Sequence, residues 1–357
     1  MFRRFSIRLS VQQMSALLNV LIALLGVSTV PSVATATSLD GPQRAQKVGD
    51  GLVGSLAPKM VVRTIDGEQI DLGSLYGRKA VYLKFWATWC KPCREQMPHF
   101  EHIYQGAGSD LAVIAVDVGL NDTVQDVQGL RSKLGLTMPI VFDDGRLGEA
   151  FHLRVTPQHV IIGKDGRIQY VGWLADQRLE DALESARTKS GSSSSPRGAA
   201  AVVDSRHYDV GDRLPKMSVR LLDGSAFDFR DSGAPMVLVF MYPWCEHEYL
   251  AKQRPELSER CRQVREQVDT LSKQNMHARW LGIASGIWTT QDDLVAYRDE
   301  YKPEIPLTLD ETGKWFRSFQ VTTVPTIVIV NRNGKIVRRA EGFDATLPEA
   351  LRSMVGK

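Results

Sequence analysis

The stretch Phe85-Trp-Ala-Thr-Trp-Cys-Lys-Pro-Cys-Arg-Glu-Gln-Met-Pro98 decides the fold of this chain. An apolar, β-rich run leads into it, so Cys90 and Cys93 lie where a predicted strand turns into a helix. The first helical turn offers unpaired N–H groups and the positive end of the helix dipole, which favour the thiolate that attacks disulfides. The spacing places Cys93 close enough to resolve a mixed disulfide on Cys90. The pair is predicted to be a redox-active dithiol.

Two other interpretations of this pair are less favoured. A purely structural disulfide between residues three apart encloses almost no chain and adds little stability. A structural zinc site needs a second ligand pair, and the sequence has no other Cys-x-x-Cys. The pattern therefore favours redox chemistry, without a cofactor or a metal.

The chain contains the same unit twice. Three blocks recur in the same order: Pro58–Arg63 as Pro215–Arg220, Ala80–Cys90 as Met236–Cys245, and Arg154–Pro157 as Thr323–Pro325. Each unit reads as strand, helix, strand, helix and hairpin, which predicts an α/β fold: a central mixed sheet flanked by helices. We expect a first domain at 49–185, a flexible Ser/Gly/Pro linker at 186–204 and a second domain at 205–357.

The N-terminus is typical of an export signal. Arginines at positions 3, 4 and 8 precede an apolar run at 16–27, and Ala34-x-Ala36 fits a cleavage site. An uncleaved membrane anchor is the alternative, but the run is shorter than the roughly 20 residues of a spanning helix. We expect a signal peptide at 1–36 and an extension at 37–48. The mature chain would then be periplasmic, without a stable membrane anchor, where disulfides persist.

Composition excludes little else. The formal net charge of +3 is spread along the chain without a basic block, which argues against a nucleic-acid surface.

The motif from Phe85 to Pro98 resembles the active-site signature of the TlpA-like branch of the thioredoxin superfamily. The resemblance covers about residues 50 to 185 and implies two tandem thioredoxin-like domains, the second degenerate. It implies an exported thiol–disulfide oxidoreductase that reduces protein disulfides with electrons from a membrane thiol donor. Cys90 would be the exposed nucleophile and Cys93 the buried resolving thiol. Trp89 and a cis Thr156–Pro157 loop would contact the substrate.

Two positions depart from the family pattern. Lys84 stands six residues before Cys90, where thioredoxins carry a buried Asp, and Leu120 stands where related reductases carry a proton-transferring Glu. One hypothesis is that Lys84 is desolvated, has a lowered pKa and serves as the base for Cys93. The alternative is that its amine reaches solvent along the side-chain stem.

The second domain lacks the complete motif, because Glu248 stands where Cys93 stands in the first. Cys245 could form a disulfide with Cys261. Sixteen residues of α-helix span about 24 Å, so this pairing requires a break, for which Pro255 and a helix N-cap at Ser258 are candidates.

Two alternatives for Cys245 stay open. It could be a lone reactive thiol, for example a peroxidatic one, or it could bind copper or another soft metal together with Met241 and His247. For the whole chain, the alternative to an enzyme is a copper or partner chaperone that uses Cys90 and Cys93 as soft ligands.

Overall fold

The computed structural model describes residues 40–188, 206–229, 233–274 and 277–355. The predicted signal peptide and nearly all of the predicted linker lie outside these residues. No helix among the described residues has the length and apolar character needed to span a bilayer.

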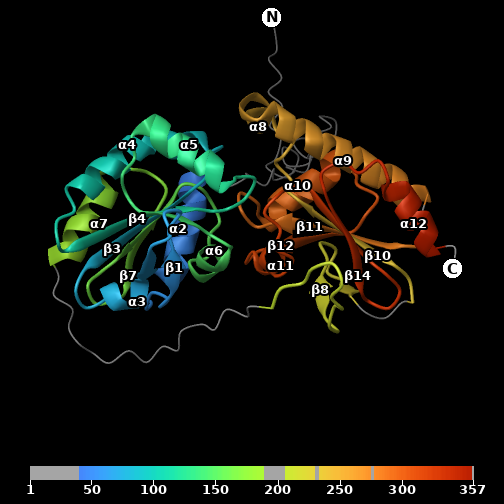
Figure 1. The fold of residues 1–357 in the computed structure, drawn as a ribbon, viewed down its shortest axis with the longest axis horizontal. Coiled ribbons are helices and arrows are strands. Elements are labelled where there is room, and N and C mark those ends of the chain that lie inside the picture. Colours follow the sequence, from blue (N-terminus) through green and yellow to red (C-terminus); the bar gives the residue numbers. More distant parts are fainter. Residues whose placement is uncertain (1–39, 189–205, 230–232, 275–276, 356–357) are drawn as a thin grey trace, which may run out of the picture. The chain divides into compact units, whose positions relative to one another are not determined.

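The first domain is built on a five-stranded sheet in the order β5-β4-β3-β6-β7 (Figure 1). The central strand β3 runs parallel to β4 and antiparallel to β6. Its neighbours cover both edges and helices cover both faces, so all seven residues of β3 are buried. The strands are β3 (Ala80–Trp86), β4 (Leu111–Asp117), β5 (Ile140–Phe142), β6 (Gln158–Ile162) and β7 (Ile168–Gly172).

Helices and a small two-stranded ribbon complete this domain. They are α2 (Gly41–Leu52), β1 (Val61–Arg63), β2 (Gln69–Asp71), α3 (Leu72–Leu75), α4 (Lys91–Gln105), α5 (Val124–Leu134), α6 (Arg146–Ala150) and α7 (Gln177–Thr188). Helix α2 packs on β7 and crosses the boundary predicted between residues 48 and 49. Asp40 caps it by accepting the Gln43 N–H, so an ordered helix stands where an extension was expected.

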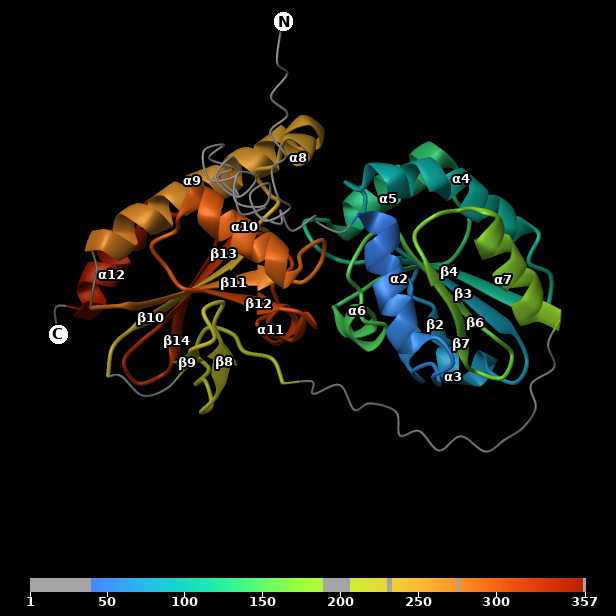
Figure 2. The same ribbon diagram turned by 180° about the vertical axis from the view of Figure 1, so that it is seen from behind.

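The second domain repeats this topology, with the strand order β12-β11-β10-β13-β14. Figure 2 shows its sheet from behind, with α9 and α12 on it. Its elements are β8 (Ser218–Arg220), β9 (Ala226–Asp228), β10 (Met236–Met241), α8 (Glu248–Gln253), α9 (Pro255–Gln274), β11 (Arg279–Ser285), α10 (Gln291–Tyr301), β12 (Leu307–Asp310), α11 (Lys314–Ser318), β13 (Thr326–Val330), β14 (Ile336–Glu341) and α12 (Leu347–Val355). The order of strands confirms the predicted fold class for both units.

Strand alternation divides the second core into two layers. Side chains of successive strand residues point to opposite faces. Val237 and Val239 of β10 therefore pack with α9 and α12, whereas Leu238 and Phe240 pack on the other face with residues such as Phe316.

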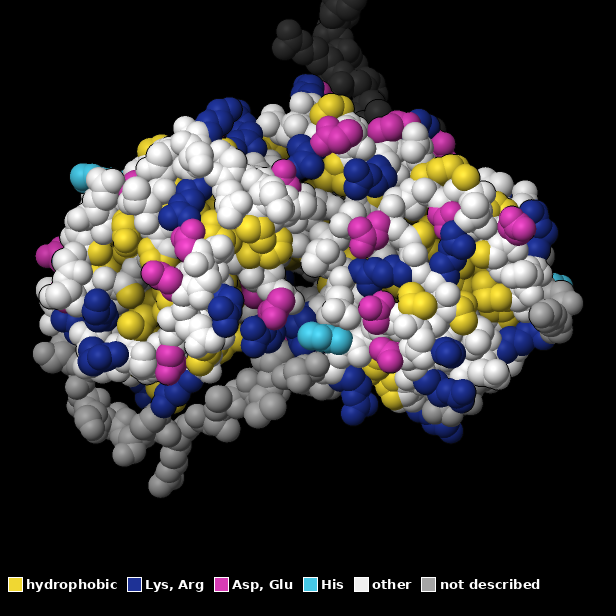
Figure 3. Space-filling model, in the orientation of Figure 1, with side chains coloured by type: hydrophobic (Ala, Val, Ile, Leu, Met, Phe, Trp, Pro, Cys, Tyr) yellow, Lys and Arg dark blue, Asp and Glu magenta, His cyan; other side chains and the backbone are white. Residues whose placement is uncertain are grey.

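Each domain has a cis proline at the start of the strand that follows α6 or α11. These bonds are Thr156–Pro157 and Val324–Pro325, so the cis geometry implied for Pro157 is present and recurs in the repeat. Over the described surface seen in Figure 3, basic and acidic side chains are interspersed. That face has no continuous basic patch of the kind that nucleic acid binding requires.

Candidate active site

The redox pair begins helix α4. Cys90 is the N-cap residue, and its Sγ accepts the N–H of Cys93 at 3.2 Å. A disulfide joins the two residues, with a Cα–Cα distance of 5.2 Å. Pro92 lies in the first turn, where its missing N–H costs no helical hydrogen bond. The dithiol therefore lies at a strand-to-helix turn, as the sequence predicts.

The exposure of Cys90 differs from the expectation. Cys93 is fully buried, as implied, but Cys90 keeps only 3% of its surface exposed, so it is not the exposed nucleophile that the resemblance implies. Trp89 is 5% exposed and Thr156 is buried.

Trp173 is a site residue that the sequence did not indicate. It lies directly after β7, on the segment that leads to α7. Its indole Nε1 donates to the carbonyl oxygen of Thr156 at 3.3 Å. This contact ties the segment after β7 to the cis-proline loop, which the resemblance implies as a substrate contact.

The loop after β4 is fastened to the motif from the other side. Trp89 Nε1 donates to the carbonyl of Leu120 at 2.8 Å. The Thr88 N–H donates to Asp122 Oδ2 at 2.7 Å, and the Thr88 hydroxyl bonds the other carboxylate oxygen. Leu120 occupies the position where related reductases carry a Glu. Asp122, two residues later, places a carboxyl group against Thr88, which stands two residues before Cys90.

The pKa of Asp122 is raised above its ordinary value, chiefly because burial disfavours the carboxylate. Asp117, at the end of β4, is fully buried, and its pKa is raised well above the usual range by burial and by the charge of Asp122. Its Oδ1 accepts the Gly119 N–H at 2.9 Å. Two buried carboxyls with raised pKa values therefore lie beneath the loop that supports the motif.

Lys84 lies beneath helix α4. Strand alternation directs Tyr82 and Lys84 to the face that α4 covers: the Tyr82 ring lies 4.8 Å from the Phe100 ring, and Lys84 Nζ lies 5.5 Å from the centre of that ring. Lys84 is fully buried, so the solvent-reaching alternative is wrong. Its ammonium donates to Gln96 Oε1 at 3.4 Å, and burial lowers its pKa to about 7. Gln96 is one helical turn after Cys93.

His159 completes this buried polar cluster. It pairs with Lys84 across β3 and β6. Its Nε2 lies 2.9 Å from Gln96 Oε1, and its Nδ1 lies 2.7 Å from the Tyr82 hydroxyl. Burial, together with the charge of Lys84, lowers the pKa of His159 well below its usual value. The neutral ring therefore donates a hydrogen bond from Nε2 to Gln96 and accepts a hydrogen bond from the Tyr82 hydroxyl at Nδ1.

Lys91, by contrast, is at the surface. Its side chain is 54% exposed and its Nζ lies 3.6 Å from Glu95, one turn along α4. Exposed pairs of this kind are weak. The Lys91 ammonium is therefore partly neutralised and well solvated, and Lys84 carries the buried amine of the site.

In the second domain, Cys245 and Cys261 form a disulfide with a Cα–Cα distance of 6.1 Å. The chain breaks at Arg254, between α8 and α9, and α9 begins at Pro255. Ser258 lies inside α9 and is not its N-cap, so the helix N-cap predicted at Ser258 is wrong. The disulfide leaves no free thiol on Cys245, which removes the lone-thiol interpretation and the soft-metal set with Met241 and His247. No cluster of three or more metal-binding side chains occurs among the described residues.

Comparison with known proteins identifies the family. The AhpC/TSA family model matches residues 53–171, and the Redoxin model matches residues 209–353. The thiol-disulfide oxidoreductase ResA of Halalkalibacterium halodurans is 35% identical over 37% of this chain and 75% of its own length. The chain belongs to the TlpA-like branch of the thioredoxin superfamily. It is a thiol–disulfide oxidoreductase.

Other relatives match the same share of this TlpA-like chain. The thioredoxin-like protein YneN of Bacillus subtilis is 33% identical over 37% of the chain and 78% of its own length. A thiol:disulfide interchange protein of Chlorobium tepidum has a solved structure that is 24% identical, with a TM-score of 0.34, over 37% of this chain and 95% of its own.

Proposed function

We propose that the first domain, within predicted residues 49–185, reduces disulfide bonds of exported proteins. The Cys90 thiolate attacks a substrate disulfide, and one substrate thiol leaves. Cys93 then attacks the mixed disulfide at Cys90 Sγ and releases the second substrate thiol. The substrate gains two electrons and two protons, and the enzyme ends as the Cys90–Cys93 disulfide. A membrane thiol donor would return it to the dithiol.

The observation that carries this proposal is the position of the pair. Cys90 caps α4 and accepts the Cys93 N–H, so the helix start stabilises a thiolate at that sulfur. The reducing direction and the export of the chain rest on the kinship with oxidoreductases such as ResA, and export also rests on the predicted signal at 1–36.

Lys84 is the proposed proton acceptor for Cys93. The resolving thiol must lose its proton before it attacks, and a neutral amine with a pKa of about 7 is suited to accept that proton. Gln96, one turn beyond Cys93 on α4, fixes the amine under this part of the helix. His159 is held neutral and orients Gln96.

Trapping of a mixed disulfide tests the mechanism. Cys93→Ser should accumulate a disulfide between Cys90 and the substrate, visible as a mass increase that dithiothreitol reverses. Cys90→Ser is the matched control and should trap nothing. If Cys93→Ser traps no partner while the wild type binds copper tightly, the chain is a soft-metal chaperone and the proposal is wrong.

The reduction potential of the Cys90–Cys93 pair tests the direction. Equilibration with glutathione or dithiothreitol buffers gives this value, and a reductant must lie below the potential of its compartment. A potential above that of the compartment would assign the chain to oxidation or isomerisation. Export is tested separately, by N-terminal sequencing of the chain from a periplasmic fraction, which should begin just after Ala36.

A further inference from the structure

The second domain keeps the framework of an exchange site although it has lost the Cys-x-x-Cys motif. Cys245 follows β10 as Cys90 follows β3. The cis bond before Pro325 opens β13 as the cis bond before Pro157 opens β6. What has changed is the origin of the second sulfur, since Cys261 comes from the second turn of α9 and lies 16 residues beyond Cys245.

Of the two cysteines of this disulfide, only Cys261 lines the cavity beneath α9. The cavity is lined by Glu246, Cys261, Arg265, Tyr297 and Pro325 together with apolar residues, and Cys245 is not among its lining residues. Cys261 is 7% exposed and Cys245 is 1% exposed. Cys261 is therefore the more accessible of the two cysteines, and its low exposure favours attack by a small molecule over attack by a folded protein.

An ion pair runs beside the disulfide and joins the same two segments. Glu246 follows Cys245, and Arg265 is one helical turn beyond Cys261. Arg265 Nε and Nη2 donate to the two carboxylate oxygens of Glu246 at 2.7 and 2.9 Å. Their side chains are only 13–20% exposed, so solvent screens this pair little. If the disulfide opens, the ion pair still holds the segments together.

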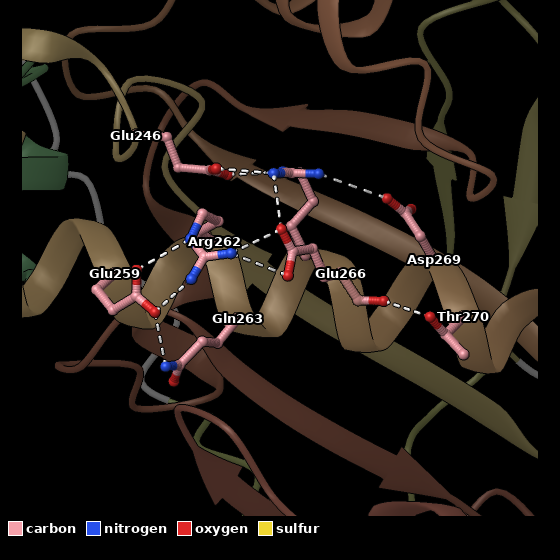
Figure 4. A network of polar contacts seen from close by, with 8 residues as sticks. Glu246, Glu259, Arg262, Gln263, Glu266, Asp269 and Thr270 are labelled. Atoms are coloured by element: carbon pink, nitrogen blue, oxygen red, sulfur yellow. Dashed lines mark hydrogen bonds and ion pairs between the residues drawn. The ribbon is translucent and has the colours of Figure 1, made fainter.

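The same cavity contains a polar group without a partner. Asp269, labelled in Figure 4, lies four residues beyond Arg265 on α9 and also lines the cavity. Its Oδ1 is buried and has no hydrogen-bond partner among the described residues. The S–H group of a thiol in the cavity would supply the missing hydrogen-bond donor to Asp269 Oδ1.

We propose that Cys245–Cys261 is a second redox centre, reduced by low-molecular-weight dithiols that attack Cys261. The incoming thiolate forms a bond to Cys261 Sγ and breaks the bond to Cys245, which leaves as a thiolate. The second thiol of the reductant then attacks the mixed disulfide at the reductant's own sulfur and releases Cys261. The reductant leaves as a disulfide, and the two cysteines take up two protons.

The first test isolates the second centre in full-length Cys90→Ser/Cys93→Ser protein, so it does not depend on the function proposed for the first domain. Reduction by dithiothreitol at pH 8 without denaturant is followed by alkylation and mass analysis. The expected rate rises in proportion to dithiothreitol concentration, and the reduced protein keeps its far-ultraviolet circular dichroism and a cooperative thermal transition. A rate independent of dithiothreitol, or loss of the fold on reduction, would mark a structural disulfide and overturn the proposal.

The second test uses two arginines on the same helix. Arg265→Gln should slow reduction about tenfold, because the cation that stabilises the thiolates is removed. Arg262→Gln is the control: this residue also forms ion pairs, with Glu259 and Glu266, but is 46% exposed and does not line the cavity (Figure 4). Equal rates in the two variants would contradict the assigned role of Arg265.

The third test identifies the attacked sulfur. In the same background, Cys245→Ser leaves Cys261 free, and Cys261→Ser leaves Cys245 free. Cys261 should form a mixed disulfide with oxidised glutathione at least about ten times faster than Cys245, because only Cys261 borders the cavity. The opposite order would refute attack at Cys261. The dithiothreitol experiment on the unchanged pair remains decisive if either variant folds poorly.

Discussion

The strongest prediction concerns the stability of Lys84→Met as a function of pH. Methionine keeps an unbranched side chain against Phe100 and removes the buried amine. Burial lowers the pKa of Lys84 from the ordinary 10.5 to about 7. Since the folded state binds this proton more weakly than the unfolded chain, the lysine destabilises the fold wherever the unfolded chain is protonated.

The magnitude follows from the difference of 3.5 between these pKa values. At about 1.36 kcal/mol per unit, the full cost is about 5 kcal/mol below pH 7, where both states are protonated. Between pH 7 and 10.5 the unfolded chain binds one proton more, so wild-type stability rises with pH. Above 10.5 the cost is gone. The advantage of Lys84→Met should therefore shrink by about 2.5 kcal/mol between pH 7.5 and 9.5.

The assay is urea unfolding of the oxidised proteins followed by tryptophan fluorescence, with both disulfides intact so that no thiol titrates. If the domains unfold in separate steps, the step that Lys84→Met shifts belongs to the first domain. Lys91→Met is the matched control, because that lysine is 54% exposed, and its effect should not vary over this pH range. A constant difference between wild type and Lys84→Met at all pH values would refute a depressed pKa for Lys84.

Three further changes test the rest of the first domain. Phe100→Ala should lower the free energy of unfolding by about 3–5 kcal/mol, measured in urea, because it empties the layer between β3 and α4. Glu101→Gln should cost about 1–3 kcal/mol at pH 7, because Glu101 accepts the Thr137 N–H at 2.8 Å. The pKa of Glu101 is lowered, so that loss should vanish in acid as the wild-type carboxylate is protonated, a comparison made by thermal melts at pH 7 and 3. Asp122→Ala should lower both the melting temperature and the rate of disulfide reduction, because Thr88 loses its hydrogen-bond acceptor. Asp122→Asn should restore the melting temperature but not the pH profile of the rate.

Much of this molecule could be predicted from local sequence. The strand-to-helix turn at Cys90 and the repeat depend on short motifs with strong steric and electrostatic requirements, whereas the cis bond before Pro157 was implied by the family resemblance alone. The departures at Lys84 and Leu120 were also visible, because Lys84 stands at a fixed distance before Cys90 and Leu120 follows the next strand.

The missing features depend on contacts between distant segments. The cluster of Lys84, Gln96 and His159 exists because β6 pairs with β3 in a register that sets Lys84 opposite His159. Asp122 reaches Thr88 from two residues beyond the expected acid, which spacing alone does not reveal. Helix α2 has no motif of the family, and only its packing on β7 shows that it belongs to the domain.

The charge of Lys84 connects proton transfer to the direction of electron flow. Under the role proposed for Lys84, a protonated amine beneath α4 would stabilise a Cys93 thiolate, and a stabilised dithiol form makes a pair more oxidising. A neutral amine gives no such stabilisation and can accept the Cys93 proton. With a pKa of about 7, Lys84 is charged in acid and neutral above pH 7. The pair should therefore become more reducing as pH rises through 7, by more than the protons released from the thiols alone require. The proposed reductant works with Lys84 in its neutral form. The family's usual buried carboxylate would also make the pair more reducing, because an anion disfavours the neighbouring thiolate.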